Sequence, residues 1–304
     1  MKKRFISICM TCAVLVGVYS PASAASFVDA DKVLNQSVSV LVPDKRNEYD
    51  HIVEIREAAK NSKRITGISA QEVEYITSDA IENELLYRAS LSDKILKEQY
   101  CYTDDVIEAL REYDGEKLET NAELRALTAT LSASIGELVR SKTRMGVVYT
   151  WEWDFKPLVR FTDYAAMSWV GTYRNGGSNT MLFDAFTSFA VVYYYFSDTK
   201  REPITHNGTD FESDNTYNGA AVSFPAEMWK DTYYYWAKYG SMFVYIDLTN
   251  QEDGPMLYEL NTHAEFAHYT VGAALDGVSF PFGLSISFTG EPTIMGEKNL
   301  CIRP

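Results

Sequence analysis

Histidine and cysteine are scarce in this chain, and their few copies form no recognisable site. There are four of each in 304 residues, with no Cys-x-x-Cys pair, so neither a zinc ribbon nor a thioredoxin-type motif is expected. The one close histidine pair, His263 and His268, lies in a β-like stretch where a spacing of five residues places the rings on opposite faces. A Gly-x-Ser-x-Gly nucleophile motif is also missing. We expect no metal and no cofactor, we assign no catalytic residue, and we favour a protein that is not an enzyme.

Basic residues are the second shortage. The chain has 28 Lys and Arg against 42 Asp and Glu, a formal net charge of −14. Nucleic acids and anionic membrane surfaces are bound by clusters of Lys and Arg. We therefore expect no nucleic-acid partner, and an anionic membrane surface is disfavoured.

Long hydrophobic runs occur only at the start of the chain. Residues 2–4 are basic, residues 5–19 are apolar but short for a membrane span, and residues 22–24 read Ala-Ser-Ala. This pattern is typical of a signal peptide. We predict a signal peptide over residues 1–25, no transmembrane span after its removal, a linker over residues 26–44 and a secreted, extracellular protein; an uncleaved anchor is the alternative.

Residues 45–144 are predicted to form a helical region. One helix is expected near residues 45–61, and three more are expected to begin at caps. These caps are Ser69, Ser92 and Thr103. The last predicted helix carries an apolar stripe at steps of three and four residues. The stripe consists of Leu124, Leu127, Leu131, Ile135 and Leu138.

Residues 145–304 change in character: helical periodicity ends, and all five Trp residues lie here. Tyr149, Trp151 and Trp153 alternate on one face of a predicted strand. Further strands are predicted over 181–196, 220–224, 233–248, 257–268 and 280–288. Short β-runs separated by Gly, Asn, Asp and Pro favour an antiparallel β-sandwich with a jelly-roll-like arrangement. The expected fold class is α+β, with the helical region first.

Two smaller patterns resemble sites. Glu152 and Asp154 lie beside the Trp residues, but a solvated strand face explains them more simply than a glycan-cleaving acid. Residues 210–215 alternate oxygen ligands like a calcium loop, yet an EF-hand is excluded because Asn215 and Ala221 stand where Gly and Glu are required. A solvated acidic loop is the favoured interpretation, and a looser calcium-stabilised loop is the alternative.

Cys101 and Cys301 are the two cysteines that follow the predicted signal peptide. In an oxidising compartment such a pair can form a disulfide. The sequence does not place their Cα atoms within bridging distance, so the pair is a disulfide candidate and free thiols are the alternative.

The densest aromatic cluster lies within residues 217–248. Its members exceed what one strand face can bury, and Tyr and Trp are the side chains that recognition surfaces favour. The predicted ligand-binding residues are Trp229, Tyr233, Tyr234, Tyr235, Trp236 and Tyr239. Packing in the core is the competing interpretation.

Residues 84–93, 102–107 and 110–115, followed by a Trp-x-Trp opening of the aromatic half at 151–153, resemble a pattern in exported proteins of Gram-positive gut bacteria. That resemblance implies no function. A shorter stretch, residues 222–236, is similar to the lipid head-group region of actinoporin-type cytolysins. The order of the other elements departs from that family.

The favoured function is therefore extracellular, non-enzymatic binding of carbohydrate or of choline-type head groups. Exposed Tyr and Trp stack on sugar rings, and an acidic aromatic surface attracts quaternary ammonium groups. The alternatives are a membrane-active cytolysin, a glycan hydrolase, and a structural or partner-binding protein.

Overall fold

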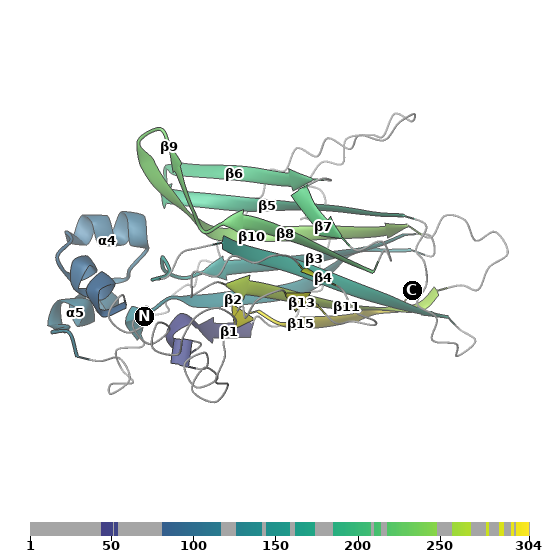
Figure 1. Cartoon of the computed structure of the whole chain (residues 1–304), viewed down its shortest axis with the longest axis horizontal. Helices are drawn as coiled ribbons and strands as arrows, with labels where there is room; N and C mark the ends of the chain where they lie inside the picture. Colours follow the sequence, from purple (N-terminus) through teal and green to yellow (C-terminus); the bar gives the residue numbers. More distant parts are fainter. Residues whose placement is uncertain are drawn as a thin grey trace, which may run out of the picture.

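The chain forms a few short helices followed by two antiparallel β-sheets in a sandwich-like, unclosed arrangement (Figure 1), so the α+β prediction is confirmed at this level. The computed structural model describes residues 44–50, 52–53, 81–116, 126–141, 144–158, 162–173, 185–207, 210–213, 218–247, 257–268, 278–279, 286–288, 293–294 and 296–303. The predicted signal peptide, and the linker up to residue 43, lie outside these residues.

The first sheet, sheet I, has the strand order β1-β2-β3-β10-β5-β6, and β9 pairs with the overhanging start of β10. All of its pairings are antiparallel. Its strands are β1 (Asp44–Asn47), β2 (Thr130–Arg140), β3 (Arg144–Trp153), β5 (Ala185–Ser197), β6 (Lys200–Asn207), β9 (Glu227–Lys230) and β10 (Tyr233–Asp247). Among the described strands, β1 and β6 form its two edges.

The second sheet, sheet II, has the order β14-β11-β4-β8-β7, and β15 pairs with β11. Its strands are β4 (Thr162–Tyr173), β7 (Phe211–Ser213), β8 (Gly219–Pro225), β11 (Leu257–His268), β14 (Thr293–Ile294) and β15 (Lys298–Ile302). A separate pair joins β12 (Val278–Ser279) to β13 (Ser287–Phe288). The chain passes between sheets I and II repeatedly, for example from β3 to β4 and from β10 to β11.

The core between the sheets is aromatic. Trp151 stacks on Phe224 of sheet II with ring centroids 5.6 Å apart, and Trp153 meets Phe266 edge-on at 6.2 Å. Tyr149, Trp151 and Trp153 are all buried, which confirms their predicted alternation on the inner face. Apolar side chains that leave water at this interface supply the main driving force for pairing the two sheets.

The predicted helix with the leucine stripe is wrong, because residues 130–140 form strand β2. Leu131 and Ile135 lie in the core between the sheets, whereas Leu138 joins a second buried cluster that contains Val148 of β3. A spacing of four residues fits a helix turn and a strand face equally well, so the stripe did not distinguish the two. Leu124 lies outside the described residues.

The sandwich therefore begins inside the region that was predicted to be helical. β1 pairs with β2, and β2 pairs with β3, so residues 44–47 and 130–140 belong to sheet I rather than to a helical region ending at residue 144. The helix expected from residue 45 is wrong at its start, and most of its remaining length lies outside the described residues.

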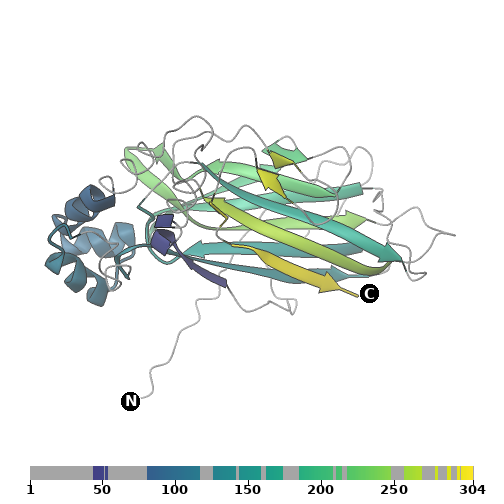
Figure 2. The ribbon, with the colours of Figure 1, turned by 60° about the horizontal axis from the view of Figure 1, so that its bottom comes forward.

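The short helices gather at one end of the sandwich (Figure 2), away from the chain's C-terminus. They are a helical segment at residues 81–89, α4 (Asp93–Tyr100) and α5 (Asp104–Glu112). Ser92 caps α4 by accepting a hydrogen bond from the Ile95 amide, and Thr103 occupies the cap position of α5, as predicted. Their shared core includes Leu85, Leu96 and Leu110.

Cys101 and Cys301 are both free thiols in the structure, which is the alternative to the disulfide candidate. Cys101 caps the C-terminal end of α4, where its Sγ accepts a hydrogen bond from Lys238 at 3.3 Å. Cys301 lies in β15, beside Asn261 of β11. The helices and the chain's C-terminus occupy opposite ends of the sandwich (Figure 1), which keeps the two thiols apart.

Candidate functional site

A two-residue hairpin connects β9 to β10 and projects toward the helices. Its turn residues, Asp231 and Thr232, have φ angles of 49° and 72°, as a type I′ turn requires at both central positions. Thr232 is β-branched, and a positive φ is strained for such a residue. Strand β8 ends at Pro225, and Trp229 lies in the next strand, β9.

One face of this hairpin carries a row of side chains toward the helices. Tyr234 pairs with Trp229, and Trp236 pairs with Glu227. Directly paired residues, and residues two apart along a strand, point to the same side. Glu227, Trp229, Tyr234 and Trp236 therefore share one face of the hairpin. This face is called the hairpin face below.

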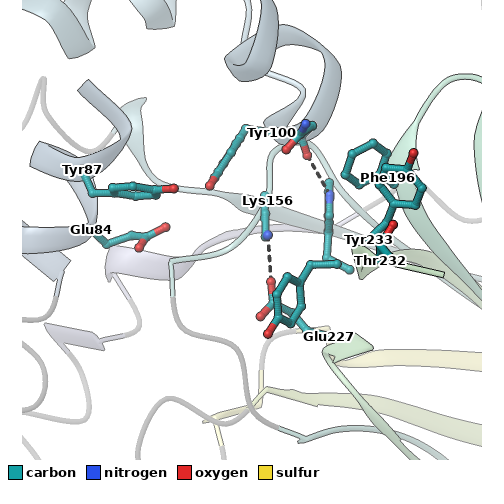
Figure 3. A pocket seen from close by; sticks show the side chains of 11 residues that line it. Glu84, Tyr87, Tyr100, Lys156, Phe196, Glu227, Thr232 and Tyr233 are labelled. Atoms are coloured by element: carbon teal, nitrogen blue, oxygen red, sulfur yellow. Dashed lines mark hydrogen bonds and ion pairs between the residues drawn. The ribbon is translucent and has the colours of Figure 1, made fainter. Parts of the chain in front are cut away.

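A cavity of about 550 Å³ lies between the hairpin face and the helices. Its size is within the range of small-molecule sites. The cavity is lined by Glu84, Tyr87, Gln99, Tyr100, Lys156, Phe196, Glu227, Thr232, Tyr233, Tyr234 and Trp236. Figure 3 shows Glu84 and Tyr87 reaching in from the helical side, Phe196 and Tyr233 on the strand side, and Lys156 between them.

The indole of Trp236 joins the two walls of the cavity. Its Nε1 donates a hydrogen bond to the backbone oxygen of Gln99 in α4 at 2.9 Å. A second backbone contact ties the same region, because the Lys156 amide donates to the Tyr100 oxygen at 3.1 Å. The hairpin and the helices are therefore held at a fixed separation, and the cavity is part of the folded structure.

Arg88 holds several residues of the cavity wall in place through hydrogen bonds on the helical side. Its guanidinium, which is fully buried, donates to Glu84 Oε1 at 2.8 Å and to the backbone oxygens of Lys156 and Pro157 at 2.8 and 2.9 Å. It also lies 4.7 Å from the ring centroid of Tyr100. Burial opposes the positive charge, but Tyr102 and Glu84 outweigh that cost and raise the pKa of Arg88. Arg88 thus fixes three residues that line the cavity.

Charges and ring faces in the cavity are largely paired within the chain. Lys156 Nζ forms a 2.7 Å ion pair with Glu227 (Figure 3) and lies 5.1 Å from the Tyr100 ring centroid. Lys200 Nζ lies 3.3 Å from the ring centroid of Tyr233 and 5.6 Å from that of Phe196. The chain's own cations therefore occupy several of the ring faces to which a cationic ligand would bind.

The six predicted binding residues are divided between the surface and the core. Trp229 and Tyr234 are each 59% exposed, and their ring centroids lie 4.3 Å apart. Tyr235, Trp236 and Tyr239 are buried, and Tyr239 stacks on Tyr193 at 4.6 Å in a cluster away from the cavity. Tyr233 is partly buried. The cavity brings together Tyr233, Tyr234 and Trp236.

Several cavity residues were not found from the sequence. Glu84, Tyr87, Gln99 and Tyr100 precede the aromatic hairpin by more than a hundred positions, and no local pattern joins them to it. Figure 3 shows the helical residues and the strand residues facing the same space. Only the folding of the helices against this end of the sandwich reveals the site.

The two histidines lie apart and have different partners. His263 contacts Asn299 and Glu265 at 2.9 and 2.5 Å. His268 is fully buried between Asp163, at 2.7 Å from Nδ1, and Glu48, at 3.8 Å from Nε2. Burial favours a neutral ring, but the two carboxylates outweigh it and raise the pKa of His268 to about 10. Glu48, Asp163 and His268 are each at most 1% exposed, so this triad is enclosed by the fold.

Of the remaining carboxylate candidates, Asp154 and Asp210 have structural partners, whereas Glu152 is exposed on β3. Asp154 accepts hydrogen bonds from the amides of Thr130 and Phe155 at 2.6 and 2.7 Å, and Asp210 accepts one from the Asn207 amide at 3.0 Å. Residues 211–213 form β7, and residues 214–217 lie outside the described part of the chain.

Within the described residues, no group of His, Cys, Asp and Glu could hold a metal ion. In the same part of the chain, no helix combines the length and the hydrophobicity that a membrane span requires.

Comparison with known proteins finds a distant structural likeness. No family model and no curated protein matches the chain. Among solved structures, a chain from "AvmM Catalyzes Macrocyclization in Alchivemycin A Biosynthesis" is similar over 55% of this chain and 89% of its own length. The sequence identity is 9% and the TM-score is 0.26. At that level the likeness carries no information about the site.

Proposed function

We propose that this protein binds a neutral carbohydrate in the cavity between the hairpin face and the helices, without cleaving it. The supporting observation is the lining itself, in which six of the eleven residues are aromatic and the others are polar or charged. Aromatic rings stack on the apolar faces of sugar rings, while side chains such as Gln99 and Thr232 offer hydrogen bonds to hydroxyls. Pockets that combine apolar walls with a few polar groups are the usual form of a small-molecule site.

A choline-type head group is the less favoured ligand. Quaternary ammonium groups bind where several ring faces are open to a cation. Here Arg88, Lys156, Lys200 and Lys238 already lie over Tyr100, Tyr233, Phe196 and Trp236. A ligand cation would have to compete with these groups. A neutral ligand does not have to compete with them, because a sugar ring stacks on an aromatic ring through dispersion and the hydrophobic effect rather than through charge.

This function is proposed to operate outside the cell, after export directed by residues 1–25. The sequence pattern of that segment supports export, and the segment lies outside the described residues.

The finer fold assignment, a jelly-roll-like sandwich, is likewise a proposal, and it is supported by the repeated crossing of the chain between sheets I and II.

The test is binding of the whole protein to a panel of unbranched β-1,4- and α-1,4-linked oligosaccharides of glucose and N-acetylglucosamine, with phosphocholine as a separate arm. Tyr87, which is 54% exposed, and Tyr234 line the cavity at the surface. Replacing either by Ala should weaken sugar binding by about 2 kcal/mol, roughly thirtyfold, if the residue is an anchor. Isothermal titration calorimetry measures the change.

The matched control is Leu86→Ala. Leu86 neighbours Tyr87 and is 43% exposed, but it does not line the cavity. This variant should bind sugars as the parent protein does. Equal loss in Leu86→Ala and Tyr87→Ala, or binding of phosphocholine alone, would contradict the proposal. Absence of binding to every sugar in the panel would remove it.

A further inference from the structure

Trp229 lies just outside the cavity but on the hairpin face that lines it. Glu227, Tyr234 and Trp236 of that face all line the cavity, and Trp229 is the fourth residue of the row. Its indole meets the Tyr234 ring edge-on, at a centroid separation of 4.3 Å and an interplanar angle of 65°. Tyr234 is therefore shared between the cavity and Trp229, and the aromatic surface continues outward without a break.

This outer surface is exposed, and it is held in place. Among the described residues, the exposed large hydrophobic side chains are Leu86, Tyr87, Trp229 and Tyr234. All four belong to the helical segment and the hairpin that flank the cavity. On the hairpin, Lys230 forms an ion pair with Glu202 of β6, and the Ala237 amide donates to the Ala226 oxygen at 2.9 Å. The ladder from Tyr233 to Trp236 therefore presents Trp229 on a fixed support.

We propose that the ligand is an extended glycan chain, whose units run from the cavity across Tyr234 to an outer subsite on Trp229. This inference rests on the proposed function. One sugar unit in the cavity leaves Trp229 without a contact, whereas a chain that leaves over Tyr234 passes directly onto it. An indole ring offers a large apolar face for the C–H face of a pyranose. A contiguous exposed apolar patch on a protein surface often marks an interaction site.

A neutral chain fits the charges at this rim. Lys230 is paired with Glu202, and Glu227 is paired with Lys156, so the hairpin presents no unpaired charge cluster to an ionic polymer. The formal net charge of −14 also repels polyanions such as nucleic acids. The favoured ligands are therefore unbranched, uncharged polysaccharides, which present one pyranose face after another.

The test uses the same oligosaccharide panel, now as length series from the monosaccharide to the hexasaccharide. In the parent protein, affinity should rise with length until the chain covers the outer subsite. Trp229→Ala should bind the longest oligomers about tenfold more weakly and leave the affinity for the shortest binding oligomer unchanged. Trp229→Phe, which keeps an aromatic face, should restore most of the loss. Tyr234→Ala should weaken binding at every length.

The outcomes separate the two proposals. Equal affinity for short and long oligomers, or Trp229→Ala equal to the parent at every length, overturns the outer subsite and leaves the cavity proposal intact. A loss in Trp229→Ala that is the same for all lengths also overturns it, because the residue would then belong to the cavity. Absence of sugar binding in the parent protein overturns both.

Discussion

The body of the sandwich and the end that faces the helices use the same residue types in opposite ways. In the body, Trp151 and Trp153 are sealed between sheets, and the charges of Asp163 and His268 are fully buried. At the helix-facing end, Tyr87 and Trp229 are more than half exposed, and the ion pairs lie at a cavity wall. Aromatic content alone therefore does not identify a recognition surface; the position of each ring relative to the sheets does.

Strand β10 shows the difference within one segment. Residues 239–246 pair with β3 on one side and β5 on the other, as a central strand of sheet I. Residues 233–236 pair with β9, and Tyr233, Tyr234 and Trp236 among them line the cavity. The register shift between Ala237 and Tyr239 marks the change. A β-bulge at such a point bends the strand, and here it lies between the central part of β10 and the part that carries the cavity-lining residues.

The sharpest test of this comparison is Trp236→Ala, because Trp236 lines the cavity but is only 1% exposed. We expect a loss of about 3–5 kcal/mol in the free energy of unfolding, the usual cost of removing a buried Trp. Urea denaturation measures it. Trp229→Ala, on the same hairpin face, should change stability by no more than about 0.5 kcal/mol. Similar small losses in both variants would show that the hairpin is not packed as described.

The stability of the sandwich body should depend on pH through the protonation of the buried His268. His268→Gln removes a cation from between two buried carboxylates and should cost about 3 kcal/mol near neutral pH. The raised pKa of His268 means that its protonation stabilises the fold fully below pH 6.5, and that this contribution is lost as pH rises toward 10.

The parent protein should therefore lose stability from pH 7 to pH 10 more steeply than His268→Gln. Comparing the two proteins subtracts the titration of Tyr and Lys residues, which both share. Parallel stability curves over this range would contradict a protonated His268 in the folded state. Leu86→Ala, which leaves the triad intact, should follow the parent curve.

A smaller loss is expected from Gly240→Ala, which tests how tightly the body is packed. A Cβ at Gly240 would lie 2.3 Å from Cζ2 of Trp151, its partner across the β10–β3 ladder. Because Trp151 is itself stacked on Phe224, the extra methyl group should cost about 1–3 kcal/mol. Gly146→Ala is the matched control, since its Cβ would meet the Tyr245 ring at 3.0 Å and should cost less. The same urea titration serves for both.

The smallest effect should be a gain, from Thr232→Gly in the hairpin turn. Glycine adopts a φ of 72° without the strain that a β-branched residue carries there. We expect a stabilisation of about 1 kcal/mol. Thr199→Gly is the control, because Thr199 occupies a two-residue turn as well, between β5 and β6, and has no positive φ. Destabilisation in both variants would show that the Thr232 side chain contributes contacts that outweigh the strain.

The strands of the aromatic half were predictable because their pattern is local. Residues 257–268 form β11 with the predicted bounds, and the alternation of Tyr149, Trp151 and Trp153 gave the inner face of β3. Strand β6 was missed because its side chains alternate between exposed and half-buried positions and none is fully buried. Its sequence is therefore mostly polar and resembles a loop. β4 was missed because Ala165, Ala166 and Met167 are buried on both faces and show no alternation.

The site was only half predictable for a related reason. Hairpin residues could be picked out as an excess of aromatic rings, but the exposure of Trp229 and the burial of Trp236 depend on where α4 packs. The buried triad was not predictable at all, since Glu48, Asp163 and His268 come from segments far apart in sequence. Long-range pairing of this kind leaves no periodic signal in the chain.

The edge strand β6 has a consequence for how molecules of this protein meet one another. An exposed strand edge offers unpaired backbone groups to any neighbouring chain, and this is a common route to aggregation. β6 begins with Lys200, Arg201 and Glu202 and continues with Pro203, which has no amide hydrogen to donate. A strand from a second copy that approached this edge would encounter the charged side chains of residues 200–202. At Pro203 it would also lack a backbone hydrogen-bond donor. Sheet I is therefore protected against growth by strand addition at this side.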